Sequence, residues 1–62
     1  MKNRTVCLWS DWKLIHLGGC NYELLKASGV QWVHSDGIRA VDDTDACNQT
    51  EWLIATADQA ED

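Results

Sequence analysis

The sequence predicts a single α+β domain over residues 1–62. We expect a small antiparallel β-sheet of two short hairpins, a candidate fifth C-terminal strand, and one short helix packed on the sheet. Three observations predict this class. A chain of 62 residues has room for one hydrophobic core. Four glycines divide it into short β-prone and helix-prone segments. Four tryptophans supply the large apolar side chains that so small a core needs.

Residues 5–17 are expected to form the first hairpin. Two β-prone runs, residues 5–9 and 12–17, lie on either side of Ser10 and Asp11, which suit a turn. The alternative is a helix capped by Ser10 and ended by Gly18. We prefer the hairpin because that helix would span less than two turns. The pairs expected across the turn are Trp9 with Trp12, Cys7 with Leu14, and Val6 with Ile15.

Residues 21–29 predict the short helix. Asn21 can cap the first backbone N–H groups, and Glu23 would lie favourably in the first turn. Gly29 suits the left-handed conformation that often follows the end of a helix. Because two helical turns are not stable alone, this segment must pack on the sheet through its leucines.

Residues 30–41 predict the second hairpin. The pair Asp36-Gly37 lies between two β-rich runs and is typical of a type I′ turn, which needs positive φ at both central residues. In this register Trp32 faces Val41. That face of the hairpin is the expected core side.

The last segment has two interpretations. Residues 50–57 slightly favour a fifth strand, because they contain the run Trp-Leu-Ile-Ala-Thr. The alternative is a helix that starts at Thr44 or Asp45. Residues 58–62 are polar, and we expect them to form a frayed acidic tail.

Charge divides the chain into two unlike halves. Residues 1–30 carry four basic and two acidic residues, whereas residues 31–62 carry one basic and eight acidic residues. The whole chain has a net charge of −5. Such a surface repels phosphate, so direct nucleic-acid binding is not expected. It attracts a basic protein surface, and the alternative is that the acidity serves solubility alone.

The reactive side chains match no catalytic motif. The sequence contains no nucleophile elbow and no phosphate-binding glycine loop, so we expect neither enzymatic activity nor a cofactor. A weak zinc alternative uses Cys7, His16 and Cys20, although no second close pair of ligands exists. We expect a cytoplasmic protein without membrane contact, because no signal-like or spanning apolar run is visible. That location and the odd count of three cysteines argue against a disulfide.

The sequence therefore predicts a small non-enzymatic protein that binds and inhibits a larger, basic, nucleic-acid-binding protein. The expected form is a nucleic-acid mimic of the kind that viruses of bacteria use against host nucleases or defence systems, such as an anti-CRISPR protein. The alternatives are a structural-zinc domain and a self-associating adaptor that forms a homodimer. The residues expected to contact the partner are Asp36, Asp42, Asp43, Asp45, Glu51, Trp9 and Trp12.

Overall fold

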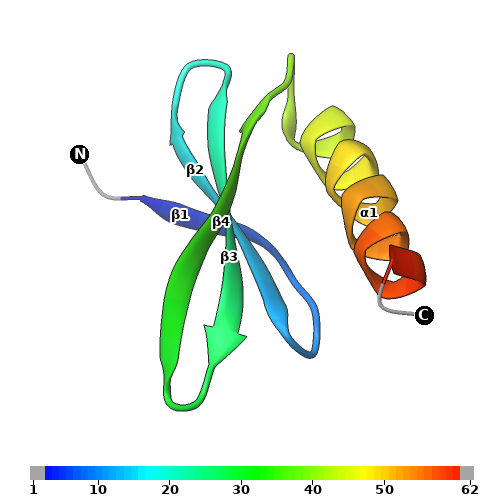
Figure 1. Cartoon of the computed structure of the whole chain (residues 1–62). Helices are drawn as coiled ribbons and strands as arrows, with labels where there is room; N and C mark the ends of the chain where they lie inside the picture. Colours follow the sequence, from blue (N-terminus) through cyan, green and yellow to red (C-terminus); the bar gives the residue numbers. More distant parts are fainter. Residues whose placement is uncertain (1–2, 61–62) are drawn as a thin grey trace.

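A four-stranded antiparallel β-sheet and one C-terminal helix make up the fold (Figure 1). The structure, a computed structural model, describes residues 3–60, and side chains through residue 57. The strands follow one another in the sheet in chain order, and α1 lies along one side of the twisted sheet. The predicted α+β class is confirmed, without a fifth strand. The elements are β1 (Arg4–Leu8), β2 (Trp12–Gly18), β3 (Asn21–Ser28), β4 (Gln31–Arg39) and α1 (Asp43–Ala60).

The predicted first hairpin is confirmed as β1 and β2. Cys7 lies opposite Leu14, as expected. The backbone N–H of Trp9 donates to the carbonyl oxygen of Trp12 (2.8 Å), which closes the turn. The predicted Val6–Ile15 pair is wrong, because a bulge between Thr5 and Cys7 places Thr5 opposite Ile15. Arg4 and Thr5, at the start of β1, are therefore shifted by one position from the simple register.

The helix predicted at residues 21–29 is wrong, because this segment forms the inner strand β3. Its two-residue alternation explains the result: Tyr22 and Leu24 are buried, while Glu23 and Leu25 are only partly covered. Strands on both sides of β3 satisfy its backbone hydrogen bonds. A two-turn helix would have gained much less from its surroundings.

The hairpin predicted around Asp36-Gly37 is also wrong. These two residues lie inside β4, which pairs with β3 instead. The turn between the two strands is at Gly29 and Val30, and Gly29 has a φ of +64°, in the left-handed region that glycine adopts without strain. Gly37 does not have positive φ, as a type I′ turn would require. The partner of this β-rich run is therefore the segment before it, not the one after it.

The strand predicted at residues 50–57 is wrong, and the alternative helix is confirmed as α1. Asp42 caps this helix, because its Oδ1 accepts a hydrogen bond from the backbone N–H of Asp45 (2.8 Å). The helical backbone continues to Ala60. The frayed acidic tail predicted for residues 58–62 stays a prediction, since residues 61–62, and the side chains of 58–60, lie outside the described part.

The hydrophobic core fills the space between α1 and one face of the sheet. The half-buried side chains of Trp9 and Trp12 pack against its edge. Thr50 is buried as well, and its hydroxyl donates to the carbonyl oxygen of Ala46 one turn earlier in the helix (2.8 Å). The core is small, as expected for the length of the chain. Its buried hydrophobic residues are Leu14, Tyr22, Leu24, Ile38, Ala40 and Ala46.

A disulfide between Cys7 and Cys47 joins β1 to α1, so the expectation of no disulfide is wrong. Packing of the helix on the sheet brings the two Cα atoms to 6.6 Å, within the range that a disulfide spans. The odd count is explained by Cys20, which is free and exposed in the turn between β2 and β3. In the part of the chain that the structure describes, no helix is both long and apolar enough to cross a bilayer.

Candidate protein-binding surface

The acidic residues at the start of α1 contact the protein's own backbone and side chains. Asp42 caps the helix, as described above. The carboxylate of Asp45 accepts hydrogen bonds from the backbone N–H of Val41 (3.3 Å) and from the amide of Gln49 (3.2 Å). Both acids also lie at the helix N-terminus, where negative charge is favourable. Their first role is therefore to start the helix and hold the segment that precedes it.

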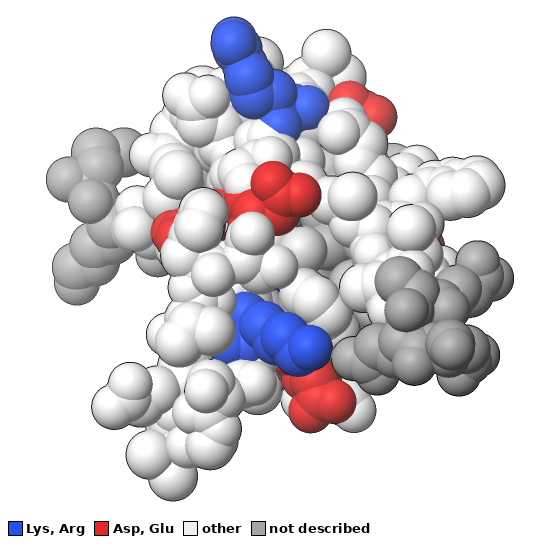
Figure 2. Space-filling model, in the orientation of Figure 1, with Lys and Arg blue, Asp and Glu red and all other residues white. Residues whose placement is uncertain are grey.

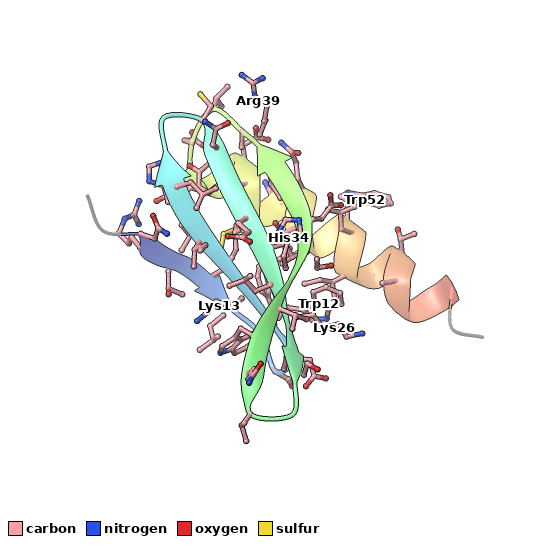
Figure 3. The ribbon with its side chains drawn as sticks, turned by 60° about the vertical axis from the view of Figure 1, so that its left-hand side comes forward. Trp12, Lys13, Lys26, His34, Arg39 and Trp52 are labelled. Atoms are coloured by element: carbon pink, nitrogen blue, oxygen red, sulfur yellow. A yellow bond between two sulfur atoms is a disulfide. The ribbon has the colours of Figure 1, made fainter. Side chains whose placement is uncertain are left out.

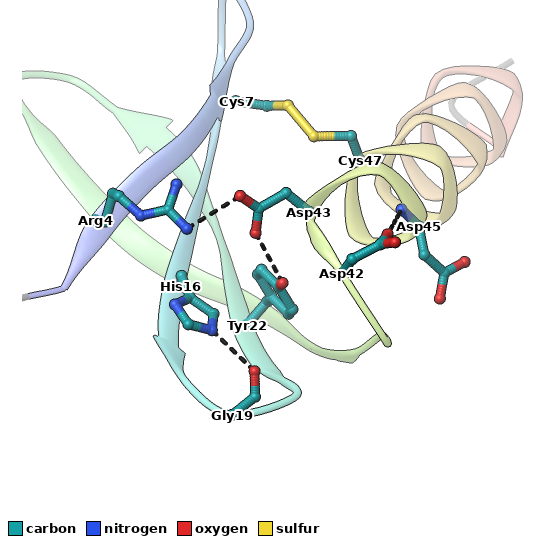
Figure 4. Close-up of polar contacts among 9 residues, drawn as sticks. All are labelled: Arg4, Cys7, His16, Gly19, Tyr22, Asp42, Asp43, Asp45 and Cys47. Carbon is teal, nitrogen blue, oxygen red and sulfur yellow. Dashed lines mark hydrogen bonds and ion pairs between the residues drawn. A yellow bond between two sulfur atoms is a disulfide. The ribbon is translucent and has the colours of Figure 1, made fainter.

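Asp43 joins α1 to the sheet through two side chains (Figure 4). Arg4 pairs with its Oδ2 (3.0 Å), and the hydroxyl of Tyr22 donates to its Oδ1 (2.9 Å). The hydrogen bonds from Tyr22 and Arg4 lower the pKa of Asp43. Burial raises the pKa of Tyr22, and the hydrogen bond to Asp43 adds to this effect. The ring of His16 lies 4.8 Å from that of Tyr22, and its Nε2 lies 2.9 Å from the carbonyl oxygen of Gly19.

The contact between Tyr22 and Asp43 predicts a loss of stability at both ends of the pH range. The folded-state pKa of Asp43 is below its ordinary 3.8, so its contribution is present above that value and is lost as the pH falls through the lowered pKa. The folded-state pKa of Tyr22 is above its ordinary 10.0, so its contribution is lost as the pH rises through the raised pKa. The melting temperature measured against pH should decline at both ends.

The variant Tyr22→Phe separates these two effects. Because Tyr22 is the one tyrosine in the chain, its contribution to the alkaline decline should disappear in the variant. The acid decline should also become weaker, since Asp43 loses the hydrogen bond that lowers its pKa most. An unchanged alkaline decline in Tyr22→Phe would contradict the assignment.

The remaining acids predicted to bind a partner lie on different elements. Asp36 lies on β4 opposite Leu24, and its Oδ1 accepts a hydrogen bond from the backbone N–H of Gly37 (2.9 Å). Glu51 is exposed on α1. Among the described residues, Glu51 takes part in no ion pair. The five predicted acids thus form no single patch: three stabilise the start of the helix, one lies on β4, and Glu51 faces outward.

The two tryptophans expected to contact a partner are engaged in the protein's own fold. Trp9 and Trp12 are half-buried and pack against the core. The ammonium group of Lys26 lies 5.1 Å from the centre of the Trp12 ring. Figure 3 shows Trp12 and Lys26 side by side. Most of the apolar area of these two indoles is therefore covered by the protein's own residues and is not available to a partner.

The outward side of α1 carries an exposed indole that the sequence reasoning did not select. Trp52 is 76% exposed and projects away from the helix (Figure 3). It borders a shallow, open groove of about 480 Å³, and Asn48, Glu51 and Ala55 complete the lining. Asn48 lies three residues before Glu51 and four before Trp52, and Ala55 lies four and three residues after them, the spacing that places side chains near one another on a helix surface. This spacing is present in the sequence, but it indicates a shared face only if residues 50–57 are helical and not the strand predicted for them.

Charge is distributed unevenly between the sheet and the helix. Residues 41–62 contain seven acidic residues and neither lysine nor arginine. Residues 3–40 contain four basic and three acidic residues. On the face of the molecule in Figure 2, basic and acidic side chains lie near one another, and neither sign covers the face. The helical segment is thus the acidic part of the molecule.

The zinc alternative receives no support from the arrangement of its ligands. Cys7 is bonded to Cys47 and therefore has no thiolate to offer a metal. Throughout the part of the chain that the structure describes, no three side chains of histidine, cysteine, aspartate or glutamate lie together as a metal site would require. The Nε2 atom of His16 contacts the carbonyl oxygen of Gly19, and the Cys20 thiol is exposed.

The chain matches no known protein-family model, and no curated protein or solved structure matches it.

Proposed function

We propose that this protein is a non-enzymatic inhibitor that docks on a larger, basic, nucleic-acid-binding protein through the outward side of α1. The observation that carries the proposal is the separation of charge. Seven acids and no basic residue lie in residues 41–62, and an exposed tryptophan lies within this acidic segment. An acidic surface of this kind speeds encounter with a basic one and selects against acidic partners.

An exposed indole adds affinity to what charge alone would give. Charged groups at the rim of an interface contribute mainly to the rate of association, whereas tryptophan is enriched among the residues that carry binding energy. Trp52 is the most exposed aromatic side chain among the described residues, and Glu51 is its neighbour. The outward side of α1 therefore combines long-range attraction with a large apolar contact.

A basic protein that binds nucleic acid offers the surface this helix would complement. In competing for that surface, the carboxylates would take the place of phosphate groups. Nucleases and defence complexes of bacteria are partners of this kind, and we place the inhibitor in the cytoplasm, where they act. Because thiols are kept largely reduced there, action in that compartment requires that the fold tolerate opening of the Cys7–Cys47 disulfide.

Competition with nucleic acid tests the proposal. Affinity capture with the immobilised protein would identify the basic partner, and fluorescence anisotropy would then follow labelled DNA bound to that partner. We expect the protein to displace the DNA. Its affinity for the partner should fall about tenfold between about 50 and about 300 mM sodium chloride, because salt screens the attraction. An affinity that is flat over this range, or DNA that stays bound when the protein is saturating, would refute the proposal.

A further inference from the structure

We infer that the groove on α1 binds an arginine side chain of the partner, with the guanidinium group over the Trp52 ring and paired with the Glu51 carboxylate. The inference rests on the proposed function, since it names the chemistry that the acidic helix recognises. It concerns one groove, lined by Asn48, Glu51, Trp52 and Ala55.

The protein's own tryptophans show how its indoles are used. The ammonium group of Lys13 lies 4.9 Å from the centre of the Trp32 ring, and that of Lys26 lies 5.1 Å from the centre of the Trp12 ring. Both distances are within the range of a cation–π contact. Among the described residues, no lysine or arginine lies over Trp52 in the same way. Since residues 41–62 contain no basic residue, no cation on the helix itself can reach this ring.

The lining of the groove suits a cation that is also flat. The Trp52 ring offers an apolar, electron-rich face, and the Glu51 carboxylate offers two acceptor oxygens beside it. The side-chain carbonyl of Asn48 is a further acceptor, and the small side chain of Ala55 leaves space at the other end. A guanidinium group stacks on an aromatic ring and donates in a fork to a carboxylate at the same time. A lysine ammonium group can do only one of these well.

Electrostatics and size point to the same occupant. Glu51 has no ion-pair partner among the described residues, so its carboxylate is available to a ligand. A groove of about 480 Å³ is large enough for one long side chain with its flanking backbone. An acidic or purely aliphatic side chain would leave the Glu51 carboxylate without a partner, or would repel it. The groove therefore selects a partner segment that presents an arginine.

Titration with a short blocked peptide tests the inference directly. The probe is acetyl-Gly-Ser-Arg-Ser-Gly-amide, compared with the same peptide carrying lysine or the uncharged analogue citrulline in place of arginine. The four indole N–H signals in a ¹H–¹⁵N correlation spectrum report on each tryptophan separately. The arginine peptide should shift the Trp52 signal and leave the Trp9 signal in place. The lysine peptide should bind more weakly, and the citrulline peptide should not bind.

Two variants and two matched controls localise the contact. Trp52→Leu and Glu51→Gln should each weaken binding of the arginine peptide about fivefold, the size expected for loss of one exposed cation–π or charged contact. Trp32→Leu and Asp11→Asn remove an indole and a carboxylate elsewhere and should leave the affinity unchanged. Because Trp52 and Glu51 are exposed, both variants should keep the wild-type circular dichroism spectrum.

The outcomes separate this inference from the proposed function. Wild-type affinity for the arginine peptide in both Trp52→Leu and Glu51→Gln would overturn the inference, as would equal binding of the citrulline peptide. If the partner still bound in a salt-dependent manner in that case, the proposed function would stand without the groove. If the arginine peptide bound as expected while the partner's affinity did not depend on salt, the groove would stand and the proposed function would fall.

Discussion

Replacing both Cys7 and Cys47 with serine should lower the free energy of unfolding by about 4 kcal/mol, on the basis of the chain entropy that the disulfide removes from the unfolded state. The two residues are 40 positions apart, so their bond closes about two thirds of the chain into a loop. A domain of this size gains roughly 3–5 kcal/mol from its core alone. The double variant should therefore be marginally stable, and urea unfolding followed by tryptophan fluorescence would show this.

Cys20 provides the matched control for that experiment. Its thiol is free and exposed, so Cys20→Ser should change stability by less than about 0.5 kcal/mol. Reduction of the wild-type protein with dithiothreitol should reproduce the behaviour of the Cys7→Ser/Cys47→Ser variant and should not affect that variant further. If the double variant unfolded at the wild-type urea concentration, the disulfide would have no stabilising role.

Leu14→Ala should lower the free energy of unfolding by about 3 kcal/mol. Leu14 is fully buried on the inner strand β2, where it lies opposite Cys7 on one side and Leu24 on the other. Its truncation removes apolar contacts and leaves a cavity between the sheet and α1, and so small a domain has few other core residues to fill it. Thermal unfolding followed by circular dichroism measures the effect.

Leu8→Ala is the corresponding control, because it makes the same chemical change on the neighbouring strand. Leu8 is 66% exposed, so its truncation should cost less than about 0.5 kcal/mol. Similar losses in Leu14→Ala and Leu8→Ala would show that the sheet face under α1 is not the principal core. Because the disulfide adds to the stability that the core supplies, the Leu14→Ala protein should remain folded at room temperature and melt at a lower temperature than the wild type.

The first hairpin could be predicted because its signals are local. The turn at Ser10 and Asp11 lies between two β-prone runs, and the Cys7–Leu14 pair follows from counting outward from that turn. The bulge near Val6 could not be predicted in this way. A bulge depends on how a strand twists against its neighbours, and no residue type marks it.

The segment 21–29 shows where local signals mislead. Asn21 and Gly29 fit the two ends of a helix, and they fit the two ends of a strand equally well. The segment becomes a strand because the strands on either side supply hydrogen bonds to both edges of β3. The same competition decided the use of Asp36-Gly37: the run at residues 31–35 found in β3 a longer partner than residues 38–41 could offer.

The candidate site was only partly predictable, for a related reason. The acidity of the C-terminal half is a property of composition and could be read directly. The roles of individual acids could not, because Asp42 and Asp43 acquired structural contacts only when residues 43–60 became a helix. That helix also turned Trp52 outward beside Glu51.

The strand order has a consequence for the path by which the chain folds. Each strand after β1 pairs with the strand before it in sequence, so the sheet can grow by successive hairpins that each close a short loop. Such contacts form within microseconds to milliseconds, whereas disulfide formation takes seconds or longer. Because Cys7 is on the first strand and Cys47 is on the helix, the covalent bond can close in native geometry only after α1 has docked. Trapping free thiols during refolding should therefore find Cys7 and Cys47 still reduced after the native tryptophan fluorescence has returned.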